Sequence, residues 1–313
     1  MGAVRPWLRV TASLASLGLA AWLVVALVPA VGGVAWTAVG EQLRAIGPGT
    51  ALWLTGLWLA GLWAYTYVLT GSLPGLRNTQ AFSLNAAGSA ISNVLPFGGA
   101  AGVAVTAVMA SSWGYSARAI TTSAIVSGLW NSLARAALPL LALAVQGAAV
   151  HGVLVAAATA AGGVVLAVVL LGRPRWLGKL LGGRAARFLL RLRRQTRQVV
   201  RAGWRRMTLG MLAYLLLQGV LLWWCLAAAG VHLGLGAALA AFAVSRLLTL
   251  AVVTPGGFGV SENGTIALLV GLGTPAAPAV AGVLLFAFFT YLVEIPLGGA
   301  AWLNWSARRA RSG

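Results

Sequence analysis

The sequence predicts an all-α polytopic membrane protein, and both its composition and its apolar runs support this. Hydrophobic residues make up 60% of the 313 residues, charged residues only 8%, and the mean hydropathy is +0.91. In soluble domains about a quarter of all residues are charged, so lipid must be the solvent for most of this chain. Apolar runs of spanning length also recur along the sequence. We expect about six full transmembrane helices and two broken, re-entrant helical hairpins.

Six apolar runs each hold the roughly 20 residues that a membrane-spanning helix needs. They cover residues 11–32, 50–71, 116–146, 152–172, 207–229 and 278–305. The first run follows Arg5 and Arg9 and begins like a signal peptide. It is longer than the apolar core of a signal peptide and further runs follow it, so we interpret it as a retained first helix.

Two further apolar regions, residues 79–112 and 235–273, are interrupted by "LPFGGAAG" and "TPGGFG". Proline and glycine weaken a helix interior, so each region should form two half-length helices joined by a turn. A helix of about 16 residues is only about 24 Å long, short of the roughly 30 Å hydrocarbon core. Irregular backbone at that depth must be buried in protein or line a wet cavity. Re-entrant hairpins fit this pattern, and tilted full spans remain the alternative.

The charges predict the topology. The chain has 22 Lys and Arg residues against 3 acidic ones, a net charge of +19. In a membrane protein such an excess reflects cytoplasmic loops and contact with anionic headgroups. With the amino terminus inside, nineteen basic residues fall on the cytoplasmic side and only Arg44 outside. We therefore expect both termini in the cytoplasm and the protein in the plasma or inner membrane. Nucleic acid is not an expected partner, because no soluble basic domain is visible.

The order of elements suggests an internal repeat within a single transmembrane domain, residues 1–313. Residues 1–147 and 148–313 each hold two spans, a broken hairpin and a third span. Three crossings give the two halves opposite orientations, which is the inverted-repeat plan of many transporters.

The second half contains a basic cytoplasmic segment, residues 173–206. Around "RFLLRLRRQTRQVV" the apolar residues share one helical face and arginines cover the rest, which predicts an interfacial helix on an anionic leaflet. A solvated loop is the alternative. The expected membrane-surface residues are Arg187, Arg191, Arg194, Arg197 and Arg201.

Signals for catalysis are scarce. The chain has no Asp, one Cys and three widely separated glutamates, Glu41, Glu262 and Glu294. The common hydrolase, metalloprotease and nucleotide-binding motifs are absent. We expect no enzyme activity, no cofactor and no metal, although a membrane-embedded enzyme with Glu262 as base is conceivable. Membrane lipids with anionic headgroups are the expected partners, and nothing indicates an oligomeric state.

Four ionisable residues fall inside apolar sequence, where a charge is costly unless it faces a partner or a cavity. Arg246 and Glu262 flank the second turn. They either pair to pin the hairpin or meet a ligand, and the sequence does not decide between these roles. A structural role is favoured for Arg135 and Glu294, which no special turn accompanies.

The second turn, "TPGGFGVSENG", is suited to bind an anionic headgroup. Helix ends expose unpaired N–H groups with partial positive charge. Pro255 ends the preceding helix, and glycines allow a ligand close to the backbone. Glu262 in the first turn of the next helix suits the helix dipole. The candidate binding residues from both turns are Arg246, Pro255, Gly256, Gly257, Gly259, Glu262, Asn93, Pro96, Gly98 and Gly99.

The stretch "AVSRLLTLAVVTPGGFGVSENGTIALLVGLG" resembles the second signature of the lysylphosphatidylglycerol synthase transmembrane-region family, the flippase-like membrane proteins. That signature has an Arg ahead of P-x-P-G-G-x-G-x-x-E and then a Gly-containing apolar helix. "NVLPFGGAAGVAVTAVMASSWG" resembles the first signature of the family, an Asn and a Pro-x-x-G turn. The order and spacing of spans fit as well, so the resemblance covers most of the chain.

Three departures bear on substrate handling. Val253 stands where the family has the first proline of the second signature, residues 98–105 lack a Glu or Arg, and the last span has Tyr291 without a preceding Arg. Only eight residues follow Trp305, so we expect no aminoacyl-transferase domain.

The resemblance implies translocation of a phospholipid, aminoacylated or otherwise anionic or zwitterionic, or of a polyprenyl-linked lipid. The alternatives are a non-transporting scaffold or regulator of a lipid- or glycan-modifying enzyme, and a membrane-embedded lipid transferase.

Overall fold

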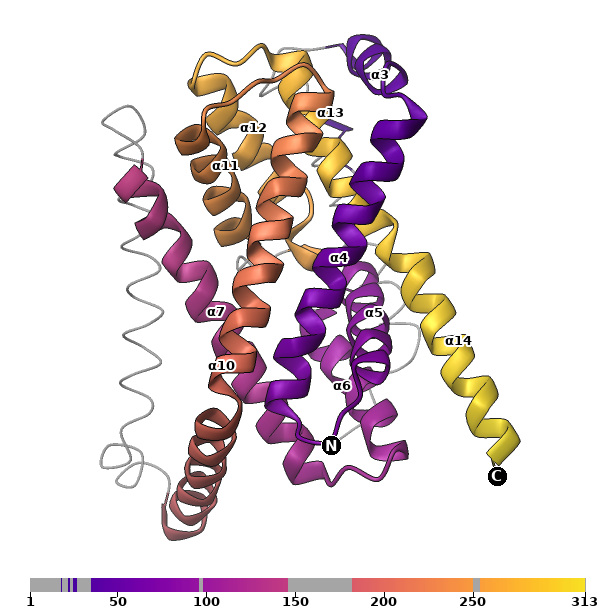
Figure 1. Cartoon of the computed structure of the whole chain (residues 1–313), viewed down its shortest axis with the longest axis vertical. Helices are drawn as coiled ribbons and strands as arrows, with labels where there is room; N and C mark the ends of the chain where they lie inside the picture. Colours follow the sequence, from indigo (N-terminus) through magenta and orange to yellow (C-terminus); the bar gives the residue numbers. More distant parts are fainter. Residues whose placement is uncertain are drawn as a thin grey trace.

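A computed structural model describes residues 35–95, 98–145, 182–249 and 254–312, with the isolated residues 18, 22, 25 and 26. Every regular element in these ranges is helical, which confirms the all-α polytopic fold (Figure 1). The spans expected at residues 11–32 and 152–172 lie almost entirely outside the described residues.

Four long apolar stretches of helix cross the height of the molecule. They are α4 (Pro48–Ser72), α7 (Ala117–Val145), the later part of α10 (Gly182–Ala228), and the consecutive helices α13 (Ala276–Ala287) and α14 (Glu294–Ser312). The 25 residues of α4 extend about 37 Å, enough to cross the hydrocarbon core. Each stretch matches a predicted span. A short helix, α3 (Trp36–Arg44), precedes α4 at the upper end of the molecule as drawn in Figure 1.

The two broken regions are short helical hairpins, as the Pro-Gly turns predict. The first consists of α5 (Asn78–Val94) and α6 (Gly98–Ser112). The second consists of α11 (Leu235–Leu248), the 3-10 turn η3 (Pro255–Gly257) and α12 (Val260–Gly271). Even the 17 residues of α5 reach only about 25 Å, too short to cross a bilayer upright.

The hairpins approach from opposite ends and their tips meet. Figure 1 shows α5 and α6 in the lower half of the molecule and α11 and α12 in the upper half. The η3 turn contacts both α5 and α6. The second turn therefore lies against the first hairpin near mid-height (Figure 1).

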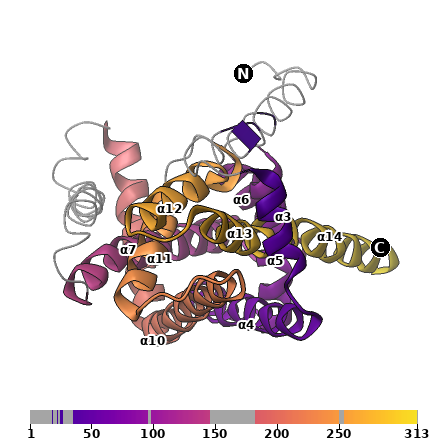
Figure 2. The ribbon, with the colours of Figure 1, turned by 90° about the horizontal axis from the view of Figure 1, so that it is seen from above.

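Close packing of α4 against α10 anchors the bundle, and Figure 2 shows these two helices side by side. Glycines make the approach possible, since a Cβ on Gly203 would collide with the carbonyl of Gly71 and one on Gly210 would lie 2.7 Å from Tyr67 Cβ. On the outer faces, Leu209 and Leu216 are largely exposed. Such exposure suits a helix whose solvent is lipid.

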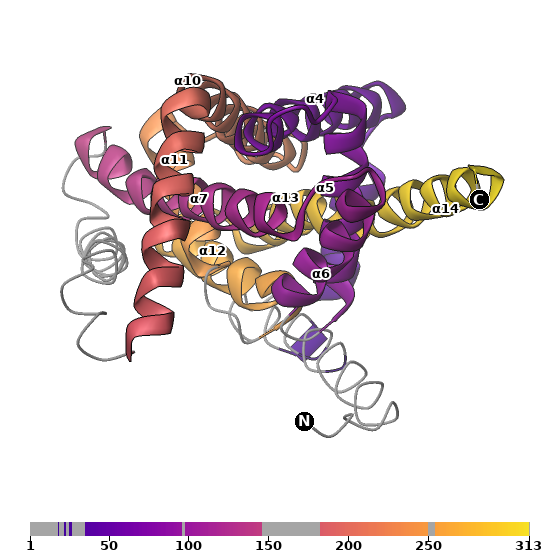
Figure 3. The same ribbon diagram turned by 90° about the horizontal axis from the view of Figure 1, so that it is seen from below.

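The basic segment is continuous with the following span. α10 runs for 47 residues, and Figure 3 shows its amino-terminal part passing across the lower face of the bundle. Near the bend into the span, Arg206 Nη2 donates to Asn78 Oδ1 at 3.1 Å and its guanidinium lies over the Tyr67 ring. The lower part of α10 is thus tied to the first hairpin.

The last span differs from the prediction of one regular helix at residues 278–305. A π-helical turn, η4 (Phe288–Leu292), separates α13 from α14, and the Val293 N–H donates to the Phe288 carbonyl at 2.9 Å. The i→i+5 bond adds one residue to the turn, a feature common at functional sites. Here it lies beside the tips of the two hairpins.

Candidate functional site

A cavity of about 460 Å³ lies between the hairpin tips and the helices α4, α7, α10 and α14; we call it the central cavity. Its wall is unusually polar for the interior of a membrane protein. Three charged side chains line it, Arg135, Arg246 and Glu294. The other polar or aromatic-hydroxyl lining residues are Tyr65, Asn85, Ser89, Ser92, Asn93, Thr106, Ser123, Ser127, Asn131, Tyr214, Gln218, Thr249, Thr254, Thr290 and Tyr291.

Two arginines form one side of this cavity. Arg246, in the last turn of α11, is only 6% exposed and lies over the Phe242 and Phe286 rings at 5.6 and 5.0 Å. Arg135, from the middle of α7, donates to Asn131 Oδ1 at 3.0 Å and to Thr249 Oγ1 at 2.6 Å. These contacts fix the two guanidinium groups, which are close enough to interact electrostatically. Like charges in a low-dielectric interior favour an anion between them.

Several buried polar atoms at the cavity have no hydrogen-bond partner among the described residues. Gln218 on α10 is 1% exposed, and neither its Oε1 nor its Nε2 is bonded. Thr254 Oγ1 and Arg246 Nε are also unpartnered. An unsatisfied buried polar group costs about 1–3 kcal/mol, so such a cluster indicates a place that a polar guest or water fills.

Another part of the cavity wall is built by η4 and α14. Tyr291 donates from its hydroxyl to the Gly256 carbonyl at 3.0 Å, which ties the π-helical turn to the second hairpin. Asn93 of the first hairpin donates to the carbonyls of Thr290 and Tyr291, each at 3.4 Å. Glu294 begins α14, is 8% exposed and lies beside Ser89, Asn93 and Trp58. The Trp58 indole N–H itself lacks a well-formed hydrogen bond. The only carboxyl group among the described lining residues is therefore at this end.

Backbone geometry explains the glycines of the second turn. Gly256, Gly257 and Gly259 have φ values of 60°, 81° and 88°, which glycine adopts without strain. A Cβ on Gly256 would lie 2.8 Å from Tyr291 Cε1, and one on Gly257 would lie 2.8 Å from Thr249 Cα. Gly256 and Gly257 line the cavity, but these glycines serve the turn and its packing. The side chain of Pro255 is not among those described.

Glu262 does not line the cavity. Its Oε2 accepts from the Gly259 N–H at 2.5 Å, and its Oε1 accepts from the Ser261 hydroxyl at 2.9 Å. It thus caps the first turn of α12 and stabilises the glycine turn through its bond to the Gly259 N–H, without facing the cavity. No ion pair joins Glu262 to Arg246 in the described ranges.

In the first turn, Asn93, Gly98 and Gly99 line the cavity, and Pro96 lies outside the described residues. A Cβ on Gly98 would collide with the Ser92 carbonyl, so Gly98 is required for close packing of α5 on α6. A Cβ on Gly99 would meet no atom within 4 Å, so this position faces open space. Residues on both sides of the first turn and in the second turn therefore line one cavity, and their binding role stays a prediction.

Sequence reasoning did not select Arg135, Glu294, Tyr291 or Gln218 for the site. The charges of Arg135 and Glu294 inside apolar runs were a usable signal, because such groups face a cavity or a partner. Gln218 gave a weaker signal of the same kind. The position of Tyr291 depends on the π-helical turn, which has no sequence marker.

Two comparisons with known proteins bear on this site. The family model described as "Lysylphosphatidylglycerol synthase TM region" matches residues 13–298, which include both hairpins and all the charged residues of the central cavity. A comparison with curated proteins found no match.

Proposed function

Since the chain belongs to the lysylphosphatidylglycerol synthase TM-region family, a multi-pass membrane family related to lipid handling, we propose that it moves a phospholipid headgroup between the two leaflets through the central cavity. The single observation that carries the proposal is the pair of arginines, Arg135 and Arg246, which line the same cavity as the unpartnered Gln218 amide. A phosphate diester supplies the anion and the acceptors that these groups lack.

The arrangement of charge favours certain headgroups. A phosphate between Arg135 and Arg246 leaves Glu294, the one carboxyl group among the described lining residues, for an ammonium group of the same headgroup. An aminoacylated or zwitterionic phospholipid satisfies both ends. A purely anionic phospholipid or a polyprenyl phosphate satisfies only the arginines and should be carried less well.

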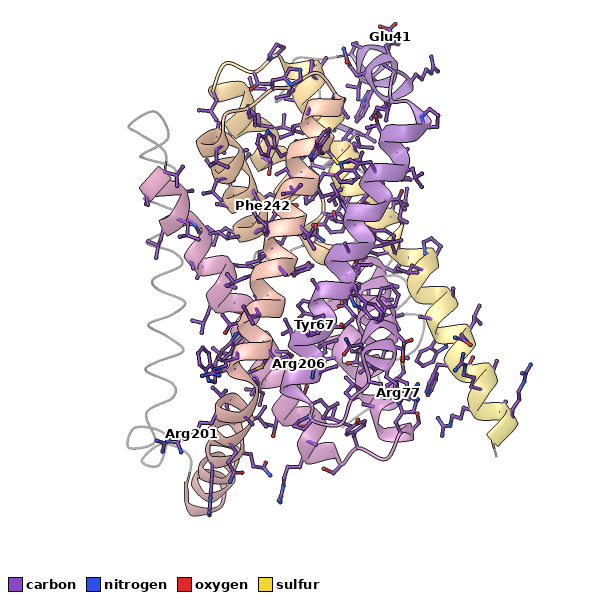
Figure 4. All side chains as sticks on the ribbon, viewed as in Figure 1. Glu41, Tyr67, Arg77, Arg201, Arg206 and Phe242 are labelled. Atoms are coloured by element: carbon purple, nitrogen blue, oxygen red, sulfur yellow. The ribbon has the colours of Figure 1, made fainter. Side chains whose placement is uncertain are left out.

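The distribution of charge also supports an orientation. Arg77, Arg201 and Arg206 lie at the lower end of the molecule, whereas Glu41 lies at the upper end (Figure 4). Basic residues concentrate on the cytoplasmic side of membrane proteins. We therefore place the lower end, which includes the last turn of α14, in the cytoplasm and the protein in the cell membrane.

A leaflet-exchange assay tests the proposal. The purified protein is reconstituted in liposomes with fluorescent lipids that differ only in headgroup, and the loss of signal to a membrane-impermeant quencher is followed. Arg135→Gln and Arg246→Gln should each slow exchange about tenfold to a hundredfold, because a hydrogen bond to a charged group contributes about 1.5–3 kcal/mol. Arg118→Gln, which removes an exposed arginine outside the cavity, should leave the rate unchanged.

The same assay separates transport from the alternatives. Tight binding of a headgroup without exchange would support a scaffold or regulator of a lipid- or glycan-modifying enzyme instead. A change in the mass of the lipid during incubation would support a membrane-embedded transferase. Equal exchange by the wild type and both arginine variants would overturn the site.

A further inference from the structure

A second cavity, of about 450 Å³, lies at the lower end of the molecule, and we call it the lower cavity. The first turn of α5, the end of α6 and the last turns of α14 form its wall. It shares no lining residue with the central cavity. Three arginines line it, Arg77, Arg308 and Arg309, and none of the described residues in its wall is acidic. The cavity is therefore a separate space with a strongly cationic wall.

Local contacts hold the arginines of α14 around this space. Arg308 donates from Nε to Asn304 Oδ1 at 3.0 Å. The Arg309 guanidinium lies over the Trp305 ring at 5.7 Å. Trp305 is itself buried, and its indole N–H donates to Ser112 Oγ at the end of α6 at 3.0 Å. The buried Trp305 ring and the arginines of α14 thus lie together in the wall of the lower cavity.

The amino terminus of α5 adds to the positive potential. Arg77 immediately precedes α5, and Thr79 and Gln80 in its first turn line the cavity. The first N–H groups of a helix have no intrahelical acceptor and carry partial positive charge. The Gln80 side chain accepts from the Arg77 N–H at 3.1 Å, which holds this turn in place at the wall of the cavity.

The lower cavity lies beside the end of a span, at the level expected for the headgroup layer of a membrane. Arg77 follows shortly after Ser72, where the span α4 ends. Trp113 and Trp305 line the cavity, and tryptophans are enriched at the membrane–water interface. On the same helix α14, Leu303 is largely exposed and suits contact with acyl chains. A molecule that fits this place carries a phosphate group, which binds the arginines, and an apolar part, which contacts the acyl chains of the membrane.

We propose that the lower cavity binds the phosphate of an anionic phospholipid, as a site distinct from the one that carries lipid through the central cavity. Basic pockets between transmembrane helices at this depth suit anionic headgroups. The recognition requires no ammonium partner, because the described wall offers no carboxylate. An anionic lipid is therefore preferred over a zwitterionic one here, in contrast to the central cavity.

Native mass spectrometry of the full chain in neutral detergent tests this site. The protein is titrated with phosphatidylglycerol or with phosphatidylcholine of the same acyl chains. The triple variant Arg77→Gln/Arg308→Gln/Arg309→Gln should lose one tightly bound phosphatidylglycerol, with an apparent Kd raised roughly tenfold or more, since each basic side chain near an anionic surface contributes about 1 kcal/mol. Binding of phosphatidylcholine should not change.

Three further variants test whether the lost binding is specific to the lower cavity. Arg194→Gln/Arg197→Gln/Arg201→Gln removes the same charge from α10, outside both cavities, and should retain the tightly bound lipid. Ala301→Trp fills the lower cavity without a change in charge and should release it. Arg135→Gln/Arg246→Gln should also retain it, so a failure of the central site is distinguishable from a failure of this one.

Three outcomes would overturn the proposal. Unchanged phosphatidylglycerol affinity in both the triple variant and Ala301→Trp would show that the arginines serve only the α14 terminus and the topology. An equal loss in the α10 control would show a non-specific charge effect. Full displacement by millimolar inorganic phosphate would assign the site to a free anion rather than to a lipid.

Discussion

At the scale of single residues, buried charge has two different uses in this protein. Both Glu262 oxygen atoms accept hydrogen bonds inside the second hairpin, so this carboxyl group is committed to the turn. Arg246 has an unbonded Nε and faces the central cavity. The sequence places both residues beside the same turn and cannot separate these uses, because the difference lies in which neighbours the folded chain supplies.

Replacement of Glu262 should affect stability more than transport. Glu262→Ala leaves the Gly259 N–H unpaired, at a cost of about 1–3 kcal/mol, and should lower the midpoint of thermal unfolding in detergent by several degrees. Glu262→Gln keeps an acceptor oxygen, so its unfolding midpoint should stay close to that of the wild type. Exchange per folded molecule should stay close to wild type. A normal melting curve with abolished exchange would show instead that Glu262 acts on the lipid.

Gln218 should show the opposite behaviour. Its two amide atoms are buried without partners, so Gln218→Leu removes a desolvation cost and should leave the melting midpoint unchanged or higher. The same change removes a donor and an acceptor from the central cavity, and exchange should fall. Gln218→Glu is the companion variant, because a carboxylate there opposes a phosphate and should slow exchange further. Lower stability in Gln218→Leu together with full activity would contradict this role.

At the scale of elements, the sequence predicts most helices well and does not predict two features, the continuity of α10 and the π-helical turn η4. Apolar length identifies α4 and α7, and the Pro-Gly turns locate both hairpins, because these signals are local. The join of α10 to the basic segment and the π-helical turn η4 are not local: both depend on packing against the first hairpin and the turn at Gly256. Tyr291 therefore reaches the site for a reason that no run of residues displays, whereas the charge of Glu294 inside an apolar run is a local signal.

Gly99 offers a test of the hairpin as a wall of the cavity. A side chain at this position meets open space, so Gly99→Leu should fold normally and narrow the central cavity. Exchange should fall most for lipids with bulky headgroups, as measured with the headgroup panel in liposomes. Gly56→Leu, an equally open position on α4 outside the cavity, is the matched control. Equal exchange in both variants would show that the lipid does not pass α6.

At the scale of the whole molecule, two short hairpins enter from opposite ends and meet at one cavity. This arrangement agrees with the plan expected of an inverted repeat, and the predicted halves, residues 1–147 and 148–313, stay a prediction. In transporters of this plan the substrate site lies near the bilayer midplane, where the two repeats meet. Arg135 and Arg246 line the central cavity, which lies at the tips of the two hairpins.

The orientation gives a prediction at this scale. Reporter fusions at Arg187 in α10 and after α14 should both report the cytoplasm, because the basic residues dominate the lower end. A fusion in the turn between α12 and α13, at residues 272–275, should report the opposite side. A periplasmic signal at Arg187 would invert the assignment and would move the lower cavity to the outer leaflet.

The π-helical turn η4 also makes the last span sensitive to chain length. A π turn holds one residue more than an α turn, so deletion of Leu292 allows α13 and α14 to join as a regular helix. The turn absorbs this extra residue as a bulge, so the deletion should leave Glu294 and the lipid-facing Leu303 close to their present faces. The turn itself would narrow and move Tyr291, whose hydroxyl donates to the Gly256 carbonyl. A single-codon deletion here is therefore expected to break the tie between the last span and the second hairpin while the rest of α14 keeps its packing.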